Sequence, residues 1–372
     1  MANKKRLTIV LCANSSWYIH NFRKNTIKAF IKKGHRVVVV APYDKSSKKL
    51  SSLATDYYEF NLNPDGTNIF LEIGVIFKLI SLYLRIKPDF VMNFTPKMNI
   101  YSTIASVISK SKVINNISGL GTAFTKDSFF SKFVFFLYRL TQIFADKVFF
   151  QNKNDMEMFI SRNIVDKDKC EYIPGSGVDL NYFNLIESPD DGVVRFIMVC
   201  RMLYEKGIEN YAKAAEFCKK KYGDKINFIA IGLLDEHNNR SVPRKVMNQW
   251  EKLGILLHKD ELEDVRSEIA HADCIVLPSI YAEGTPKSLL EGASMGKPII
   301  TTNMPGCAST VVEGVNGYLC KPNSISDLVS CMEKIYKLTH KCRLEMGLRG
   351  RELMEEKFDE QIVIKKYLEQ LH

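Results

Sequence analysis

Features that mark several protein classes are missing from this chain. Its nine cysteines are scattered, and no two stand at the CxxC spacing of zinc and redox sites. No run of about 18 uncharged apolar residues occurs, and the first apolar run (7–13) has only the length of a strand, so we expect neither a membrane-spanning helix nor a secretion signal. Glycine and proline are not enriched, which argues against a long disordered region. We therefore expect a globular cytoplasmic protein whose cysteines stay reduced.

Signatures of several enzyme and nucleic-acid-binding classes are absent as well. No HExxH or Walker A sequence, helix-turn-helix, zinc finger or RNP-type aromatic pattern occurs. An Asp-x-Asp at residues 166–168 stands in a polar loop, far in sequence from the other candidate residues. We expect it to bind no metal, and we expect no catalytic metal and no cofactor elsewhere.

The charge of the chain is unevenly spread. The 372 residues suit two hydrophobic cores better than one, and their net charge is +10. Residues 1–150 hold 22 Lys/Arg against 8 Asp/Glu, whereas the rest holds 30 against 34. The basic first half suits an anionic partner, and without the signatures above an anionic lipid or substrate is favoured over nucleic acid.

Strand-like apolar runs alternate with amphipathic helical patterns through the first half. Strands are expected at 7–12, 37–42, 89–94, 112–117 and 147–151, and helices at 21–33, 69–86, 98–109 and 129–143. The serine-rich stretch 46–52 is interpreted as a surface loop. The alternation predicts a mostly parallel sheet with helices on both faces.

A turn-rich stretch (174–192) interrupts this rhythm, which then restarts. Strands are expected at 194–200, 226–232, 274–279, 297–301 and 317–321, and helices at 207–221, 262–270 and 358–371. We predict an α/β protein of two doubly wound, Rossmann-like domains facing a cleft. Its parts are an N-terminal domain (1–175), a linker (176–192), a C-terminal domain (193–357) and a last helix (358–372) that packs near the linker or on the first domain.

Two segments of the second half carry residues suited to chemistry. Glu283-Gly-Thr-Pro-Lys-Ser-Leu-Leu-Glu291 follows an expected strand, and Pro286 suits the start of a helix whose first N–H groups attract an anion. Two carboxylates there suit a ligand with hydroxyls next to phosphate, although solvated helix-end carboxylates explain them equally well. Arg201 and Lys206 stand in the turn after strand 194–200, where they can bind phosphate oxygens.

Together these residues resemble the retaining GT-B glycosyltransferases of family 4. The resemblance rests on RMLYEKG (201–207), the E-x7-E spacing of Glu283 and Glu291, and PGSGVD (174–179). WYIHNFR (17–23), NFTPKMNIY (93–101) and INNISGLGTAF (114–124) are similar to the bacterial branch that builds O-antigen, capsule and related lipid-linked glycans.

The resemblance implies roles for residues of the second half. Arg201 and Lys206 would hold the diphosphate of a sugar donor, Glu283 the hydroxyls of the transferred sugar, and Glu291 the ribose. Sugar and phosphate would also contact the backbone of the segment formed by Gly284, Thr285, Pro286, Lys287 and Ser288.

Two residues of the first half are candidates too. His20, expected in the loop after the first strand, matches a histidine that faces the sugar or the acceptor in some relatives; a structural role is the alternative. Lys97 either meets an acceptor phosphate or is solvated. The loop 13–16 lacks the glycines that many relatives carry there.

Two helical segments of the basic half mix aromatic and basic residues: GVIFKLISLYLRIK (74–87) and SKFVFFLYRLTQIF (131–144). Such segments lie in membrane interfaces, and part of each must also face the domain core. We expect peripheral binding to an anionic membrane surface on the inner face of the cell membrane.

The sequence thus predicts a metal-independent, α-forming glycosyltransferase. It would move a hexose or N-acetylhexosamine from a UDP-sugar to a lipid-linked saccharide acceptor of undecaprenyl diphosphate type. A sugar-nucleotide epimerase on the same fold and a non-catalytic sugar-binding partner subunit are the alternatives.

Overall fold

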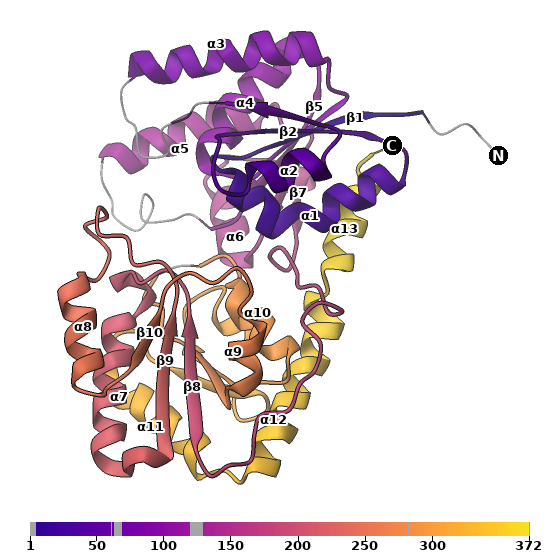
Figure 1. Ribbon diagram of the computed structural model, residues 1–372. Helices are drawn as coiled ribbons and strands as arrows, with labels where there is room; N and C mark the ends of the chain where they lie inside the picture. The colour runs from indigo at the N-terminus through magenta and orange to yellow at the C-terminus, as the bar shows by residue number, and fades with distance from the viewer. Residues whose placement is uncertain (1–4, 61, 63–68, 120–128, 282, 372) are drawn as a thin grey trace. The chain divides into compact units, whose positions relative to one another are not determined.

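The chain forms two compact α/β units. The structure, a computed structural model, describes residues 5–60, 62, 69–119, 129–281 and 283–371 (Figure 1). Residues 120–124, which belong to one of the segments that carry the family resemblance, lie outside these ranges. Unit 1 comprises residues 1–176 and 363–372, and unit 2 comprises residues 177–362. The chain therefore leaves unit 1 after Ser176 and returns to it at Val363.

Unit 1 is built on a parallel sheet with the strand order β3-β2-β1-β4-β5-β6-β7. The strands are β1 (Thr8–Cys12), β2 (Arg36–Ala41), β3 (Asp56–Glu59), β4 (Phe90–Asn93), β5 (Lys112–Ile117), β6 (Lys147–Phe150) and β7 (Cys170–Tyr172). Since all pairings are parallel, the carboxyl ends of the strands share one edge. The order reverses between β1 and β4, and the carboxyl edge at such a point is where open α/β sheets bind ligands.

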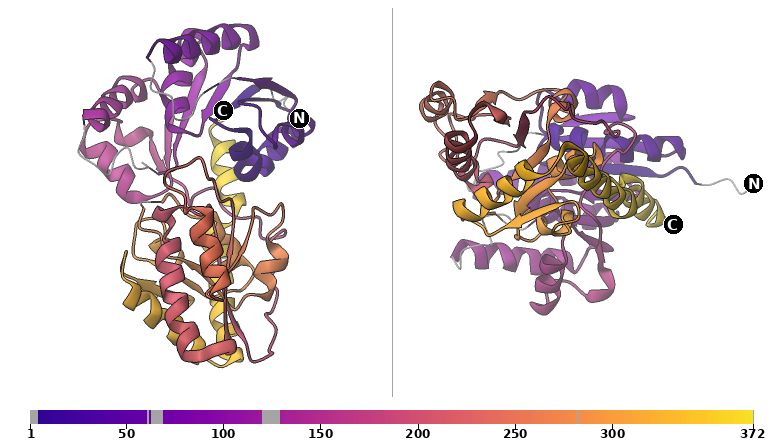
Figure 2. Two further views of the ribbon diagram at one scale, coloured as in Figure 1. Left: turned by 60° about the vertical axis from the view of Figure 1, so that its left-hand side comes forward. Right: turned by 90° about the horizontal axis from the view of Figure 1, so that it is seen from below.

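Helices cover both faces of this sheet (Figures 1 and 2). One face packs on α1 (Ser16–Lys32), α2 (Ser47–Leu53) and α13 (Glu360–Glu369). The other packs on α3 (Ile69–Ile86), α4 (Pro96–Ser109), α5 (Phe129–Gln142) and α6 (Lys153–Ser161). Alternate strand residues face the two layers, so Ile9 and Leu11 join one core while Val10 and Cys12 join the other.

Helix α1 begins earlier than the sequence suggested. The Ser15 hydroxyl accepts a hydrogen bond from the Tyr18 N–H, and Asp44 accepts one from the Trp17 N–H at 2.7 Å. These caps satisfy the first N–H groups and start the helix at Ser16. The expectation that His20 lies in a loop is therefore wrong, because His20 belongs to the second turn of α1.

The stretch 46–52 is not a surface loop either. It forms most of α2, in which Leu50 is fully buried. Asp44 accepts from the Ser46 N–H and donates its own N–H to the Ser47 hydroxyl, both at 2.8 Å. Hydrogen bonds of Asp44 thus hold the start of this short helix, and Leu50, with the partly buried Leu53, anchors it to the core.

Unit 2 repeats the architecture with the order β10-β9-β8-β11-β12-β13, again parallel. Its strands are β8 (Val194–Val199), β9 (Ile226–Ile231), β10 (Leu257–Lys259), β11 (Cys274–Leu277), β12 (Ile299–Thr302) and β13 (Gly317–Cys320). Its helices are α7 (Ile208–Tyr222), α8 (Arg244–Lys252), α9 (Arg266–His271), α10 (Lys287–Ser294), α11 (Ile325–Lys337) and α12 (His340–Leu353). The helix expected at 262–270 starts only at Arg266, and α8 was not predicted. The α/β prediction of two Rossmann-like domains is confirmed.

Candidate active site

The candidate residues of unit 2 gather at the carboxyl edge of its sheet, where β8 and β11 lie side by side. The turn after β8 carries Lys206, and the loop after β11 carries Glu283. The Lys206 ammonium donates a short hydrogen bond to the Glu283 carboxylate, although 77 residues separate them. The Ser279 hydroxyl donates to the same Glu283 oxygen at 3.0 Å.

The Lys206–Glu283 pair is largely shielded from solvent, with exposed side-chain fractions of 17% and 12%. Burial alone would lower the pKa of Lys206, but the charge and the hydrogen bond of Glu283 outweigh it and raise the pKa above its ordinary value. Lys206 therefore stays cationic, and Glu283 is held in one orientation by two donors.

Two glycines let the loops of this edge approach closely. Gly207 has a φ of +81°, and a Cβ there would lie 2.0 Å from the Pro278 carbonyl oxygen. Gly306 also has a positive φ, and its Cβ would lie 1.7 Å from the Gly284 carbonyl oxygen. Any side chain at Gly207 would push the turn that carries Lys206 away from the loop of Glu283.

Arg201 is the exposed cation of this edge. Its guanidinium has no hydrogen-bond or ion-pair partner in the described part of the chain, and its charge repels that of Lys206. An unpaired arginine next to a fixed lysine is available for an anion, and its planar fork suits two phosphate oxygens at once.

Helix α10 adds a partial positive charge to the same edge. Pro286 precedes it and makes no side-chain capping hydrogen bond. Glu291 lies on the second turn, 3.8 Å from the Lys287 ammonium, and is 13% exposed. Gly284 and Thr285 lead into the helix as buried residues, and Ser288 follows half-buried. The start of this helix, with the macrodipole, attracts negative charge.

Neighbours of Glu283 that the sequence did not single out complete this environment. Ser279, at the end of β11, fixes the carboxylate, and the Lys206 ammonium lies 5.9 Å from the centre of the Tyr281 ring. Burial, assisted by the charge of Glu283, raises the pKa of the buried Cys307 thiol to about 12, so it stays protonated. No signal in the sequence alone pointed to Cys307, which comes from the loop after β12.

His20 belongs to unit 1, where it is half-buried on α1. Lys97 is not solvated, as one expectation had it, because it pairs with Glu72 at 2.6 Å. Both side chains are at most 20% exposed. Lys97 therefore belongs to a buried ion pair that joins the starts of α3 and α4.

The carboxyl edge of unit 1 holds buried polar atoms that have no hydrogen-bond partner among the described residues. They are the three guanidinium nitrogens of Arg23 and one oxygen each of Asn93, Thr95 and Asn99. Arg23 is 1% exposed and lies over two rings, 4.6 Å from the centre of Phe94 and 5.5 Å from that of Tyr367. Buried polar groups are nearly always hydrogen-bonded, so this cluster indicates ordered water or a polar ligand.

Across the described residues, no group of three or more His, Cys, Asp or Glu side chains could hold a metal ion. Nor is any helix in that part of the chain long and apolar enough to cross a membrane.

Comparisons with known proteins identify the family and the fold of the chain. The family model "Glycosyl transferase 4-like" matches residues 8–152, and "Glycosyl transferases group 1" matches residues 186–353. The chain is 25% identical to N,N'-diacetylbacillosaminyl-diphospho-undecaprenol alpha-1,3-N-acetylgalactosaminyltransferase of Campylobacter jejuni, over 94% of both chains. It is 27% identical to UDP-Gal:alpha-D-GlcNAc-diphosphoundecaprenol alpha-1,3-galactosyltransferase of Escherichia coli, over 69% of both.

Solved structures show the same fold. A glycosyltransferase of Rickettsia africae aligns with a TM-score of 0.79 at 19% identity, covering 98% of this chain and 97% of that one. Alr3699/HepE of Anabaena in complex with UDP-glucose aligns with a TM-score of 0.79 at 16% identity, covering 98% and 99%. The predicted GT-B fold is thus confirmed, and the chain belongs to the family 4 glycosyltransferases of that fold.

Proposed function

We propose that this glycosyltransferase moves a hexose or N-acetylhexosamine from a UDP-sugar to a bacterial surface glycan carried on undecaprenyl diphosphate. The new linkage would keep the α configuration of the donor. The Campylobacter and Escherichia relatives support the acceptor class, since their names specify undecaprenol-linked substrates and α-1,3 transfer. The Anabaena structure in complex with UDP-glucose supports the donor class.

The observation that carries the proposal is the fixed Lys206–Glu283 pair, together with Arg201, which has no partner among the described residues, and the start of α10. Two cations and a helix N-terminus stabilise the charge that grows on a departing diphosphate without a metal ion. Glu283 accepts from Lys206 and Ser279 through one oxygen, Oε1. Its remaining acceptor positions suit hydroxyls of the transferred sugar, while Glu291 suits the ribose.

The transfer step needs no enzymatic nucleophile. The bond between the anomeric carbon and the β-phosphate oxygen breaks, and its electron pair leaves with UDP. The acceptor hydroxyl attacks the same face, and its proton passes to the departing phosphate oxygen. This route fits a site whose carboxylate Glu283 is engaged by two donors and whose buried thiol Cys307 stays protonated. Arg201 and Lys206 stabilise the leaving group throughout.

Unit 1 supplies features suited to the acceptor. The unpartnered polar atoms of Arg23, Asn93, Thr95 and Asn99 lie at the carboxyl edge, where sheets of this type bind ligands. They offer a cation and oxygen acceptors to hydroxyls or to a phosphate. His20 stays a further candidate for this acceptor side.

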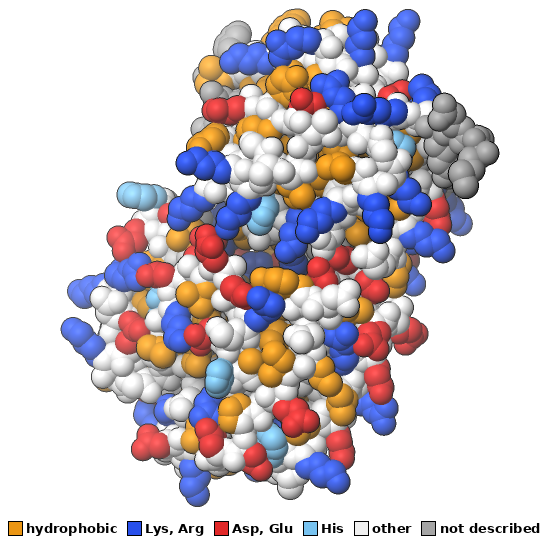
Figure 3. Space-filling model, turned by 45° about the vertical axis from the view of Figure 1, so that its right-hand side comes forward, with side chains coloured by type: hydrophobic (Ala, Val, Ile, Leu, Met, Phe, Trp, Pro, Cys, Tyr) orange, Lys and Arg blue, Asp and Glu red, His pale blue; other side chains and the backbone are white. Residues whose placement is uncertain are grey.

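We also propose that unit 1 binds the inner face of the cell membrane. Helices α3 and α5 flank α4 and expose apolar side chains at helical spacing, among them Phe77 (66%), Leu84 (49%), Phe136 (55%) and Leu140 (49%). On the face drawn in Figure 3, most charged side chains of unit 1 are Lys or Arg, whereas unit 2 shows acidic and basic side chains intermingled. Exposed aromatics flanked by cations suit an anionic lipid interface. The nine cysteines are free thiols, which fits a reducing compartment.

The deciding experiment measures UDP release from a panel of UDP-sugars, with and without membrane extract. Acceptor-dependent release with an α-linked product is the expected result. Turnover of a UDP-sugar without any acceptor would indicate an epimerase, and no release in any combination would indicate a non-catalytic subunit. Addition of EDTA should leave the rate unchanged; a lost rate that Mg²⁺ restores would contradict the metal-free mechanism.

Membrane binding is tested by co-sedimentation with lipid vesicles. Replacing Phe77 and Phe136 by serine should weaken binding to vesicles that contain phosphatidylglycerol, because both rings leave the interface. The matched control is Phe217→Ser, which changes a phenylalanine of unit 2 that is 52% exposed. Equal loss in both variants would contradict the assignment of this face.

A further inference from the structure

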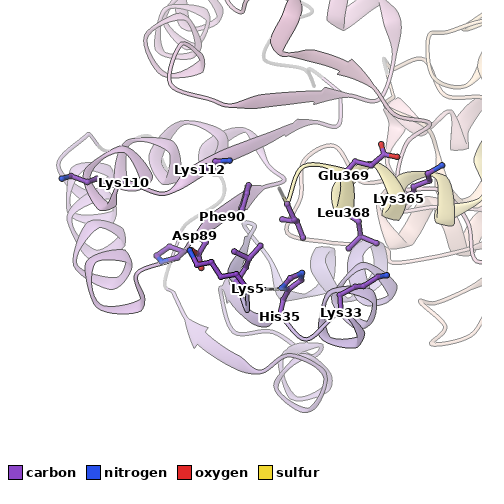
Figure 4. Close-up of a pocket in the computed structure, with 13 residues that line it drawn as sticks. Lys5, Lys33, His35, Asp89, Phe90, Lys110, Lys112, Lys365, Leu368 and Glu369 are labelled. Atoms are coloured by element: carbon purple, nitrogen blue, oxygen red, sulfur yellow. Dashed lines mark hydrogen bonds and ion pairs between the residues drawn. The ribbon is translucent and has the colours of Figure 1, made fainter. Parts of the chain in front are cut away.

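A cavity of about 730 Å³ opens at the amino edge of the unit 1 sheet (Figure 4). Its walls come from the amino ends of β1, β4 and β5, the carboxyl ends of α1 and α4, and the last residues of α13. The residues proposed to bind the donor and the acceptor belong to carboxyl edges, so this hollow serves none of the roles proposed above.

The hollow is strongly basic at its rim. Five exposed lysines line it: Lys5, Lys33, Lys110, Lys112 and Lys365. The acidic residues lining it are Asp89 and Glu369. Asp89 is already used, because it accepts from the Lys5 ammonium at 3.2 Å and from the Thr8 N–H at 2.8 Å. The rim therefore keeps a net positive charge.

Three of the rim lysines are unpaired. The side-chain ammonium groups of Lys33, Lys110 and Lys365 make no ion pair or hydrogen bond with any described residue. Lys33 and Lys110 follow the last residues of α1 and α4, where a cation also favours the helix dipole. Helix ends do not account for Lys365, which lies inside α13, or for Lys112, which begins β5.

The interior of the hollow is apolar. Leu7, Phe90, Leu368 and Leu371 line it, and the Lys112 ammonium lies 5.2 Å from the centre of the Phe90 ring. In Figure 4 the ends of Lys33, Lys110 and Lys365 stand on different sides of the hollow and do not converge on one point. Lysines distributed around an apolar interior suit a bulky, amphiphilic anion and the molecules packed next to it better than a single small ion.

We infer that this amino-edge pocket binds the phosphate-bearing headgroup of an anionic membrane lipid. Continuity with the proposed membrane face supports the lipid source: α3 ends at Ile86, and Pro88 and Asp89, two and three residues farther on, already line the pocket. Lys110 directly follows α4, the helix between the exposed stripes of α3 and α5. The inference rests on the proposed membrane association of unit 1 and is independent of the donor site.

The test compares two triple variants of the full chain by co-sedimentation with phosphatidylcholine vesicles, with and without phosphatidylglycerol. The pocket variant carries Lys33→Gln, Lys110→Gln and Lys365→Gln. The control carries Lys28→Gln, Lys48→Gln and Lys167→Gln, three exposed lysines elsewhere in unit 1 that make the same change in charge. Thermal melting checks that both variants fold.

The pocket variant should lose at least about 10-fold in affinity for the anionic vesicles, since each lysine near such a surface contributes to binding, and the control should lose clearly less. Equal losses in the two variants would overturn the inference, because charge alone would then explain binding. The inference would also be overturned if the wild type bound vesicles equally well with and without phosphatidylglycerol.

Soluble anions separate a lipid from a free phosphate. Glycerol phosphate and inorganic phosphate are titrated against the wild type and the pocket variant without vesicles. The lipid assignment would be overturned if the wild type bound one of these anions tightly and the pocket variant lost that binding but still bound vesicles. The pocket would then be assigned to a free phosphate. Acceptor-dependent UDP release is measured separately with the acceptor in detergent, so a failed pocket and a failed transfer reaction give different results.

Discussion

The carboxyl edges of the two sheets are completed to different degrees. In unit 2, Glu283 is held by Lys206 and Ser279, and a single cation, Arg201, stands ready without a partner among the described residues. In unit 1, Arg23 and its neighbours keep buried polar atoms that have no hydrogen-bond partner in the described part of the chain. One edge is therefore preorganised before any ligand arrives, whereas the other gains its last hydrogen bonds from ordered water or a ligand.

The largest effect is expected at the preorganised edge. Glu283→Gln keeps the shape but leaves Lys206 without its counter-charge and weakens the hold on the sugar. We expect kcat to fall by roughly 10³-fold, the upper range for a lost electrostatic contact. The rate of acceptor-dependent UDP release measures it. Glu333→Gln, which breaks the surface pair of Glu333 with Lys221, is the matched control and should leave the rate intact. A near-normal rate in Glu283→Gln would remove this site assignment.

Two buried arginines, one in each unit, allow the same contrast to be tested through the free energy of unfolding. Arg343 of unit 2 donates to Asp273 at 3.1 Å, and the Asp273 side chain is fully buried, whereas Arg23 of unit 1 has no acid partner. Arg343→Met should lower the free energy of unfolding by about 3 kcal/mol, because it strands a buried carboxylate. Arg23→Met should change it by less than about 1 kcal/mol or raise it.

Urea titration of both variants measures these changes. If Arg23→Met were the more destabilising of the two, the interpretation of Arg23 as an uncompensated charge would be wrong. A stable Arg23→Met protein with a raised KM for the acceptor would instead support a ligand contact.

Substitutions of Arg201 test whether its cation acts on the departing diphosphate. Arg201→Ala should lower kcat about 10²-fold, because one of two charges on the departing diphosphate is lost. Arg201→Lys should recover part of the rate, since lysine restores the charge but not the bidentate geometry. Steady-state kinetics with saturating UDP-sugar measure both. Arg349→Ala, at a surface pair with Glu352, is the control. Equal rates for the alanine and lysine variants would show that charge at this position is irrelevant.

The smallest effect is expected at the incomplete edge. Thr95→Val deletes a hydroxyl that has no hydrogen-bond partner among the described residues, so stability should hold while the KM for the acceptor rises about 10-fold, the scale of one hydrogen bond. The KM for the UDP-sugar should not change. Thr103→Val, whose hydroxyl donates to the Asn99 carbonyl at 2.8 Å, should instead lower the melting temperature. An unaltered acceptor KM in Thr95→Val would place the acceptor elsewhere.

Local patterns predicted much of this fold. The strand runs and the helix at 69–86 are confirmed because their apolar residues repeat with the period of the element. The start of α1 and the whole of α2 were missed. Asp44, in the loop directly before α2, contributes to both, because it accepts from the Trp17 N–H of α1 and from the Ser46 N–H. Sequence also supplied Lys206 and Glu283 as candidates, but their contact across 77 residues follows only from the neighbouring positions of β8 and β11.

Other features could not be predicted from local patterns at all. The amino-edge pocket joins Lys5 to Lys365, and the unpartnered cluster joins Arg23 to residues of β4 and α4. Such features depend on which elements pack together. The roles of Arg201, Lys206, Glu283, Glu291 and His20 stay predictions for the experiments above.

The return of the chain to unit 1 at its far end has a consequence for biosynthesis. Val363, Tyr367 and Leu371 belong to the same core as Ile9 and Val37, so the core of unit 1 is completed by residues that are translated after the whole of unit 2. On the ribosome, unit 2 can bury its core while unit 1 still exposes the surface that awaits α13. Nascent chains arrested before residue 363 should therefore bind chaperones through the incomplete unit 1. Removal of residues 363–372 should destabilise unit 1 before unit 2.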